Sequence, residues 1–482
     1  MYLGPIIIIT IHRFFSTQIL LHMYINNLLE ASQSRLVNSE VIMQRIRSLI
    51  QHFDRYSDEV AEKCIIDEYN HLLKVSLFYP SLKSPLAAGI HLLQFVIYVV
   101  TLIFHLAIIA ITVIKSQPQD FLIVIHTVHF GFIMFLFLSF IFMTNSVRYE
   151  LCISHKIIGQ GVYTYEDEEV SDEESNMKRK YEAIKRKLKL ILPSMNLVAG
   201  LFVVVIGPWV DSILASGNLK TFTDSGINLA LPVPIWHPLD THDSLNFYIA
   251  FYGECICAHI VIVILASASC CYFTCTLHVI IQLERLIMSV RNLEKRAISM
   301  YRRRVPTSEN QLKKDILYEN AAYMECLEFC FRQNIQHHLQ ILRFNRLVNI
   351  LTRGPVFATF FAGGVILGMS ALVITLGNEK PGILLGTLSV AMTELANITA
   401  ICKAGQTITD LNEDLHLMFY SVPWQRFSKS LKSSLYIVQE MTCRDMIVNG
   451  MFNFTANMET YGSILNTAYS CFSLLIAFKS AD

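Results

Sequence analysis

The sequence predicts an all-α membrane protein, a bundle of seven transmembrane helices with its N-terminus in the cytosol and its C-terminus outside the cell. Of the 482 residues, 53% are hydrophobic and only 16% are charged. The apolar residues gather into runs long enough to cross a hydrocarbon core, which needs about 20 helical residues. These runs do not alternate between apolar and polar positions as the strands of a membrane barrel do. The predicted spans are residues 86–114, 121–147, 193–215, 246–276, 351–376, 382–405 and 446–478.

The positions of lysine and arginine predict the orientation of the bundle. Of the 39 Lys and Arg residues, 34 lie in segments 1–85, 148–192, 277–350 and 403–445, which share one side of a seven-span bundle. The excess of positive charge in cytosolic loops places that side in the cytosol. The orientation is the reverse of that of a G-protein-coupled receptor. The formal net charge of zero gives no reason to expect a nucleic-acid partner.

The region before the first span, residues 1–85, is predicted to be cytosolic. Its apolar beginning, residues 1–29, has neither a basic start nor a small-residue cleavage site, so we interpret it as an interfacial or re-entrant segment. The triplet Asp54-Arg55-Tyr56 looks like a signature of rhodopsin-like receptors. It precedes the first span instead of closing the third, so we interpret it as a chance match.

The second span carries two histidines, His126 and His129, whose spacing puts both on one helix face. A metal site would need further ligands near them, and the other outer half-spans contain no companion pair of histidines. Two interpretations remain open for these residues. They are either hydrogen-bonded membrane histidines or polar groups in an aromatic pocket for a small molecule.

The third span and the outer loop after it contain the main irregular features of the membrane region. Gly207-Pro208-Trp209 predicts a kink, because proline removes one backbone hydrogen bond and crowds the preceding turn. The outer loop, residues 216–245, includes a stiff stretch rich in proline and aromatic residues at 231–238. We expect this stretch either to cover a cavity or to lie in the aromatic belt at the membrane interface.

Charged helical patterns continue beyond the apolar runs of the fourth, fifth and sixth spans. They predict a cytosolic helical anchor built from extensions of helices 4, 5, 6 and 7, where subunits would meet. The inner loop 148–192 contains an acidic run at 166–174, which is expected to be solvated. The chain is predicted to divide into a cytosolic N-terminal region 1–85, helices 1–4 over 86–276, helical extensions over 277–350, helices 5 and 6 over 351–405, an anchor segment 406–445 and helix 7 over 446–478.

Two pairs of small residues predict close helix packing inside one subunit. Gly364 and Gly368 are four residues apart in the fifth span, as are Gly382 and Gly386 in the sixth. Such pairs let the backbones of two transmembrane helices approach closely.

The last span carries a stripe of small, mildly polar residues on one helix face, from Ser463 through Thr467 and Ser470 to Leu474. A stripe of this kind can line a water path through the membrane. It can equally let two helices pack closely. The helix taken alone does not decide between the two.

The C-terminal third of the chain contains an ordered series of short motifs. Val422-Pro423-Trp424 lies in the last inner segment, Val448-Asn449-Gly450-Met451-Phe452 leads into the last span, and Ser470-Cys471-Phe472-Ser473-Leu474-Leu475 closes it. Their order and spacing resemble the C-terminal signature of the insect odorant receptors. In that signature, a Trp-containing inner segment leads to a Gly-x-Phe turn and a Ser-Tyr-x-Phe-x-x-Leu-like run. The seven spans with an internal N-terminus resemble the same family over most of the chain.

Within this resemblance, the end of the last span favours a ligand-tuning odorant receptor. Insect gustatory receptors usually end in a Thr-Tyr pair followed by Gln-Phe, and the odorant co-receptor subunit also keeps that Gln. The matching positions here are Ser470-Cys471 and Ala477-Phe478, so the Gln is missing. A gustatory receptor or a co-receptor-type channel subunit is the alternative. A G-protein-coupled receptor is a remote one, since the last span lacks an Asn-Pro-x-x-Tyr run.

The resemblance implies a subunit of an odorant-gated, non-selective cation channel in the plasma membrane of sensory neurons. Such a protein is not an enzyme, needs neither cofactor nor metal, and forms a hetero-tetramer with the odorant co-receptor around one pore. The last span would line that pore, with an apolar constriction that keeps water out until the helices rotate. The pore and gate residues implied in this chain are Ser463, Thr467, Ser470, Leu474 and Phe478, the last two forming the constriction.

The resemblance also implies a binding pocket for a volatile ligand in the outer half of each subunit, between spans two, three, four and six. The ligand would bind mainly by burial of apolar surface, with a few polar groups to orient it. The residues that the predicted topology puts there are Phe132, Phe135, Val205, Trp209, Tyr248, Tyr252, Leu388 and Met392.

Overall fold

The structure is a computed structural model. It describes residues 58–79, 85–117, 120–166, 172–214, 222–305, 317–376, 381–451 and 454–481. The predictions for residues 1–29, for Asp54-Arg55-Tyr56 and for most of the acidic run lie outside the described residues, as does the side chain of Phe478. The compact unit considered below comprises residues 57–80 and 92–482.

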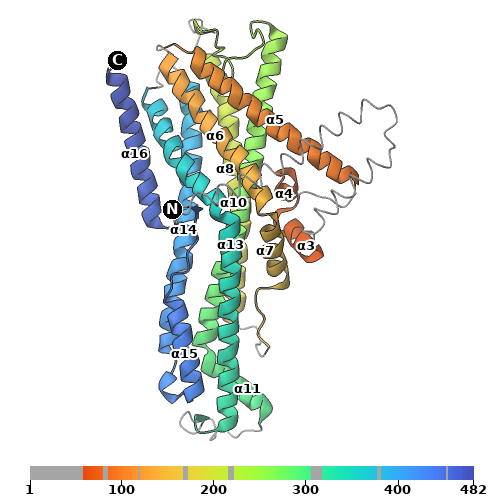
Figure 1. The fold of residues 1–482 in the computed structure, drawn as a ribbon, viewed down its shortest axis with the longest axis vertical. Helices are drawn as coiled ribbons and strands as arrows, with labels where there is room; N and C mark the ends of the chain where they lie inside the picture. The colour runs from red at the N-terminus through yellow and green to blue at the C-terminus, as the bar shows by residue number, and fades with distance from the viewer. Residues whose placement is uncertain are drawn as a thin grey trace, which may run out of the picture. The chain divides into compact units, whose positions relative to one another are not determined.

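The described portion of the chain is almost entirely helical (Figure 1), as predicted, and its only β-structure is two isolated bridges, Phe222–Asn228 and Asn449–Thr455. The helices are α3 (Glu59–Tyr69), α4 (Leu72–Val75), α5 (Pro85–Lys115), α6 (Phe121–Ser146), α7 (Arg148–Gln160), α8 (Asp172–Leu201), the π-helix η2 (Phe202–Ile206), α9 (Gly207–Leu214), α10 (Ser244–Arg291), α11 (Leu293–Arg304), α13 (Ala321–Leu376), α14 (Pro381–Ser421), the 3₁₀ turn η4 (Trp424–Arg426), α15 (Lys429–Thr442) and α16 (Met458–Ala481).

The first six predicted spans correspond to helices in the structure. Six helical segments of the described chain are long and apolar enough to cross a membrane: α5, α6, α8 continued through η2 and α9, α10, α13 and α14. The protein is therefore a multi-pass membrane protein. The seventh predicted span corresponds to α16.

Helix α16 begins at Met458, later than the predicted start of the seventh span at residue 446. The residues before it form a turn, which is held by Asn349 of α13. The Asn349 side chain donates to the carbonyl of Ile447 at 2.9 Å and accepts the backbone N–H of Asn449 at 2.8 Å. A side chain from another helix thus satisfies backbone groups that an extended helix would have paired internally. The seventh helix has no extension of the predicted kind.

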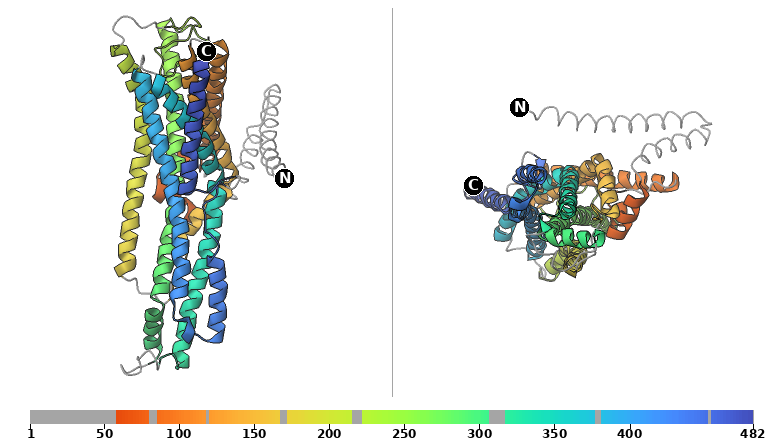
Figure 2. Two further views of the ribbon diagram at one scale, coloured as in Figure 1. Left: turned by 90° about the vertical axis from the view of Figure 1, so that its left-hand side faces the viewer. Right: turned by 90° about the horizontal axis from the view of Figure 1, so that it is seen from below.

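Helices α10, α13 and α14 continue well beyond the predicted spans and run side by side (Figures 1 and 2). At the end away from the C-terminus, α11 packs on α13 and α15 packs on α14. Buried Arg296 of α11 donates to Gln333 at 2.7 Å and to Asn334 at 2.9 Å, both on α13. The predicted extensions of the fourth, fifth and sixth helices are thus present in the structure. Their position on the cytosolic side stays a prediction.

The predicted irregularity in the third span is confirmed by the π-helix η2, which lies directly before Gly207-Pro208. Proline lacks a backbone N–H and crowds the carbonyl one turn earlier, and a π-type turn accommodates both effects. The irregular segment is fixed against α14. A Cβ atom on Gly382 would lie 2.0 Å from the Gly207 carbonyl oxygen, and the Gly382 N–H donates to Asp211 of α9 at 2.7 Å.

The glycine pair of the fifth span, Gly364 and Gly368, brings α13 close to α16. A Cβ atom on Gly368 would lie 2.8 Å from the carbonyl oxygen of Ala468, and one on Gly364 would lie 3.4 Å from Thr467. The side chains of Ile464 and Ala468 are buried in α16. Both small-residue pairs therefore promote close packing within one chain, as predicted.

We predict that Gly382→Ala destabilises the protein, because the added methyl group would overlap the Gly207 carbonyl. Overpacking of this kind costs about 1–3 kcal/mol, which exceeds the gain of up to about 1 kcal/mol expected for Ala over Gly in a helix. The measurement is the thermal unfolding midpoint of the detergent-purified protein. Gly253→Ala in α10 is the matched control, since a Cβ atom there meets nothing within 4 Å. Equal midpoints for the two variants would contradict the packing described.

Candidate functional site

A cavity of ≈ 120 Å³ lies within the bundle. An engineered apolar cavity of about 150 Å³ holds benzene, so this space matches a small organic molecule. Most of its wall is apolar, and the polar side chains on it are His105, Asn196, Glu254, Thr393 and Glu394. Its wall includes Ile109 of α5, Phe130 and Phe137 of α6, Ala199 of α8, Val203 of η2, Val261 of α10, Ile366 of α13 and Val390 of α14.

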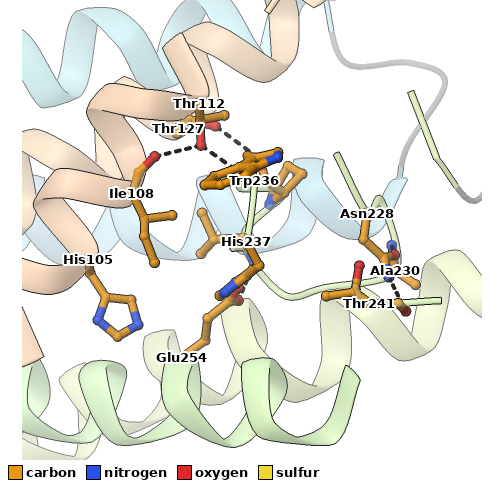
Figure 3. A network of polar contacts seen from close by, with 12 residues as sticks. His105, Ile108, Thr112, Thr127, Asn228, Ala230, Trp236, His237, Thr241 and Glu254 are labelled. Carbon is orange, nitrogen blue, oxygen red and sulfur yellow. Dashed lines mark hydrogen bonds and ion pairs between the residues drawn. The ribbon is translucent and has the colours of Figure 1, made fainter. Parts of the chain in front are cut away.

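The loop stretch 231–238 forms one wall of this cavity, through Pro232, Val233 and Ile235. Of the two interpretations of this stretch, covering a cavity is therefore the correct one for these three residues. A loop in apolar surroundings must find partners for its backbone groups, because no neighbouring strand or helical turn pairs them. Side chains of three helices supply them here, as Figure 3 shows.

Thr112 of α5 and Thr127 of α6 hold the loop on one side. The Thr112 hydroxyl accepts the backbone N–H of Trp236 at 2.9 Å and donates to the Ile108 carbonyl at 2.8 Å. The Thr127 hydroxyl donates to the carbonyl of Pro234 at 3.2 Å. The ammonium group of Lys115 lies 3.6 Å from the centre of the Trp236 ring, a cation–π contact that adds to this attachment.

Glu254 of α10 holds the loop from the other side. One carboxyl oxygen accepts the backbone N–H of Val233 at 2.9 Å, and the other lies 3.3 Å from Nε2 of His237 (Figure 3). Glu254 is 4% exposed, so both contacts form away from bulk water, where charged and polar hydrogen bonds are strong. Glu254 therefore lines the cavity and also holds the loop in place through its two hydrogen-bond contacts.

The predicted ligand-binding residues do not line this cavity. The expected helices do line the cavity, but none of the eight predicted residues does. Seven of these side chains are exposed at the surface of the single chain, and Phe132 is half-buried against the core. The seven are Phe135, Val205, Trp209, Tyr248, Tyr252, Leu388 and Met392.

The physical reason is that a membrane helix can be apolar all round. Lipid solvates an apolar side chain as well as a protein core does, so hydrophobicity alone does not show which face points inward. A more informative signal lies in the same spans. Glu254 and Glu394 are acidic residues inside apolar runs, and a carboxyl group in such a run almost always faces the bundle interior.

His126 and His129 are buried and do not line the cavity. Nδ1 of His126 lies 3.4 Å from the Thr387 hydroxyl of α14, and Nε2 of His129 lies 3.4 Å from the Ser370 hydroxyl of α13. Each histidine thus has one hydroxyl contact with a neighbouring helix, as expected for hydrogen-bonded membrane histidines, while Nδ1 of His129 has no partner among the described residues.

A second group of buried side chains has metal-ligand chemistry. Nitrogen or sulfur atoms of His155, Cys271 and Cys275 lie within 4.8 Å of one another. Both ring nitrogens of His155 are engaged, because Nδ1 lies 2.7 Å from the Leu151 carbonyl and Nε2 lies 2.8 Å from the Tyr69 hydroxyl. A carbonyl only accepts, so Nδ1 carries the proton, and burial lowers the pKa of His155 to about 4. A metal ion at Nε2 would have to displace Tyr69.

The predicted pore stripe lies on the accessible side of α16. Ser463, Thr467, Ser470 and Leu474 are exposed in the single chain, whereas Ile464 and Ala468 are buried, and Thr467 also borders Gly364 of α13. The three hydroxyl groups donate to carbonyls one turn earlier in the helix, at 2.9–3.1 Å.

With the helices, cavity and loop defined, comparison with known proteins identifies the family. The family model described as 7tm Odorant receptor matches residues 132–469, well over half of the chain. The chain belongs to this odorant receptor family.

Individual relatives agree with this membership. The sequence is 24% identical to odorant receptor Or1 of Anopheles gambiae over 267 residues, which cover 52% of this chain and 61% of that protein. It is 26% identical to odorant receptor 46a, isoform B, of Drosophila melanogaster over 156 residues, 30% of this chain and 38% of that one. The chain thus spans less than two thirds of the length of these relatives.

The fold is shared with a solved structure. The insect olfactory receptor OR5 from Machilis hrabei, in complex with eugenol, superposes with a TM-score of 0.66 over 86% of this chain and 99% of that one. The sequence identity is 11%, so the likeness is one of fold. A second structure of the same receptor gives a TM-score of 0.65 over 87% of this chain and 99% of that one, at 13% identity.

We predict that Thr112→Val loosens the loop that closes the cavity. Valine keeps the shape of threonine but leaves the partly buried N–H of Trp236 without this acceptor, at a cost of about 1–3 kcal/mol. The measurement is the thermal unfolding midpoint. Thr375→Val is the control, because it loses a similar hydroxyl bond to a carbonyl one turn earlier, at an exposed position with no loop attached. A midpoint shift no larger than that of the control would contradict this role for Thr112.

Proposed function

We propose that this chain is the ligand-tuning subunit of an odorant-gated, non-selective cation channel. It binds a small volatile molecule in the cavity beneath the loop 231–238. In a tetramer with the odorant co-receptor, in the plasma membrane of sensory neurons, this binding opens a central pore lined by α16. The observation that supports the proposal most directly is an apolar cavity with a few polar groups inside a member of the odorant receptor family.

The connection between cavity and pore helix runs through α13. Ile366 of this helix belongs to the cavity wall, while Gly364 and Gly368 contact α16. A ligand that favours one position of α13 therefore acts on a helix in direct contact with α16. Binding energy shifts the gate only by the difference in affinity between the closed and open states.

The accessible stripe of α16 supports a pore-lining role. Asn466 lies beside Ser463 and Ser470 on the exposed side of the helix, and an amide facing lipid is costly. A water-filled pore or a polar neighbour removes that cost. Leu474 is 57% exposed, so a ring of such side chains from several subunits would narrow and dewet the pore. The same proposal assigns Phe478 to the constriction.

We predict that co-expression with an odorant co-receptor produces cation currents within milliseconds of odorant application, without a requirement for G proteins. Whole-cell recording with a broad odorant panel measures this, with co-receptor alone as the control. Surface delivery is checked independently with a C-terminal epitope on intact cells. A delivered protein that gives no current with any odorant, or a current abolished by blocking G proteins, would overturn the proposal.

We predict that Leu474→Ser raises the current in the absence of odorant, because a hydroxyl ring admits water where a leucine ring excludes it. Leu388→Ser is the matched control, since Leu388 is also an exposed leucine but lies on α14. Unchanged closed-state current at normal surface delivery would remove Leu474 from the gate.

A further inference from the structure

Two residues of the cavity wall, Glu394 on α14 and Asn196 on α8, each carry a buried polar atom with no partner among the described residues, Oε1 and Oδ1 respectively. Glu394 is 8% exposed and Asn196 is 3% exposed, so bulk water does not replace the missing partners. The amide nitrogen of Asn196 is already engaged, because it donates to the Leu192 carbonyl at 2.8 Å. Both free atoms are hydrogen-bond acceptors, and leaving them unpaired is costly.

The other acidic residue of the wall does not share this property. Both oxygens of Glu254 have partners, the Val233 N–H and the His237 ring. No lysine or arginine lies among the described residues of the wall, so no side chain there provides a fixed positive charge. The wall residues that lack a hydrogen-bond donor as a partner are thus Glu394 and Asn196.

The chemistry of the missing partner follows from these two acceptors. An ester, ketone or aldehyde only accepts hydrogen bonds and would leave a Glu394 carboxylate unpaired, whereas a Glu394 carboxylic acid would donate to it. An alcohol brings one donor. A protonated primary amine brings three donors and a positive charge, and a charge-assisted hydrogen bond to a carboxylate is stronger than a neutral one.

We propose that the cavity is tuned to small apolar amines, whose ammonium group binds Glu394 with Asn196 as a second acceptor. This inference rests on the proposed function, since it names the ligand class of the same cavity. The alkyl portion of the ligand lies against the apolar wall, which includes Phe130, Val203 and Val261. A protonated amine meeting a Glu394 carboxylate forms this ion pair directly. A neutral amine meeting a Glu394 carboxylic acid forms the same ion pair once the proton moves from the acid to the amine, because the two starting pairs have the same atoms and the same total charge.

The test compares three ligands of equal chain length, hexylamine, 1-hexanol and 2-hexanone, on cells that express the receptor with its co-receptor. The amine is expected to act at a lower concentration than the other two. Glu394→Gln keeps the shape of the side chain and removes its charge. It is expected to raise the half-maximal concentration of hexylamine by about 10- to 100-fold, the range of a charged hydrogen bond, and to leave the value for 1-hexanol nearly unchanged.

Glu440→Gln is the matched control, since Glu440 is exposed on α15 and distant from the cavity wall. Asn196→Leu is a second variant, which tests the inference independently if Glu394→Gln fails to fold. It is expected to weaken the amine response more than the ketone response. Equal potency of hexylamine and 2-hexanone, or an unchanged hexylamine response in Glu394→Gln, would overturn the inference.

A binding measurement separates this inference from the channel proposal. Hexylamine should raise the thermal midpoint of the purified wild-type protein and not that of Glu394→Gln, whether or not any current is recorded. A midpoint shift without current would reject the channel function and retain the amine site. Currents evoked by neutral odorants, with no response and no midpoint shift for hexylamine, would reject the amine site and retain the channel.

Discussion

Polar groups inside an apolar bundle have no water to bond with, and this constraint explains the attachments at three places in the described part of the chain where the regular helix is interrupted. Three interruptions illustrate it. The break at Gly207-Pro208 is joined to α14 through Asp211, and the turn before α16 is held by Asn349. The loop 231–238 takes its partners from Thr112, Thr127 and Glu254. In the turn and the loop, side chains from neighbouring helices satisfy backbone groups of the irregular segment, whereas beside the break Asp211 accepts the backbone N–H of Gly382 at the start of α14.

The cavity is a consequence of the third of these attachments. The loop stays folded into the bundle because its N–H and carbonyl groups are paired there, and its proline and aliphatic residues then complete the cavity wall. Glu394 and Asn196, which also belong to this wall, each keep a buried polar atom without a partner among the described residues. The proposed amine site rests on these two residues.

The comparison with Machilis hrabei OR5 shows which features a fold can keep at 11% identity. A bundle requires apolar helices of sufficient length and small residues at close crossings, and many sequences meet those requirements. The side chains on the cavity wall are under no such general constraint. Receptors of one fold can thus differ in ligand chemistry through a few wall positions such as Glu394.

The sequence by itself determined the helical class, the first six spans, the irregular third span and the family, because apolar run length, proline and short motifs act locally along the chain. The tertiary structure decided which face of each helix points inward, and so replaced Trp209, Tyr248 and Met392 by Asn196, Glu254 and Glu394 on the cavity wall. It also decided that α16 begins at Met458, since Asn349 stabilises a turn that the local pattern does not predict. In a membrane, lipid and protein core solvate apolar side chains alike, so the inward face follows only from the contacts between helices.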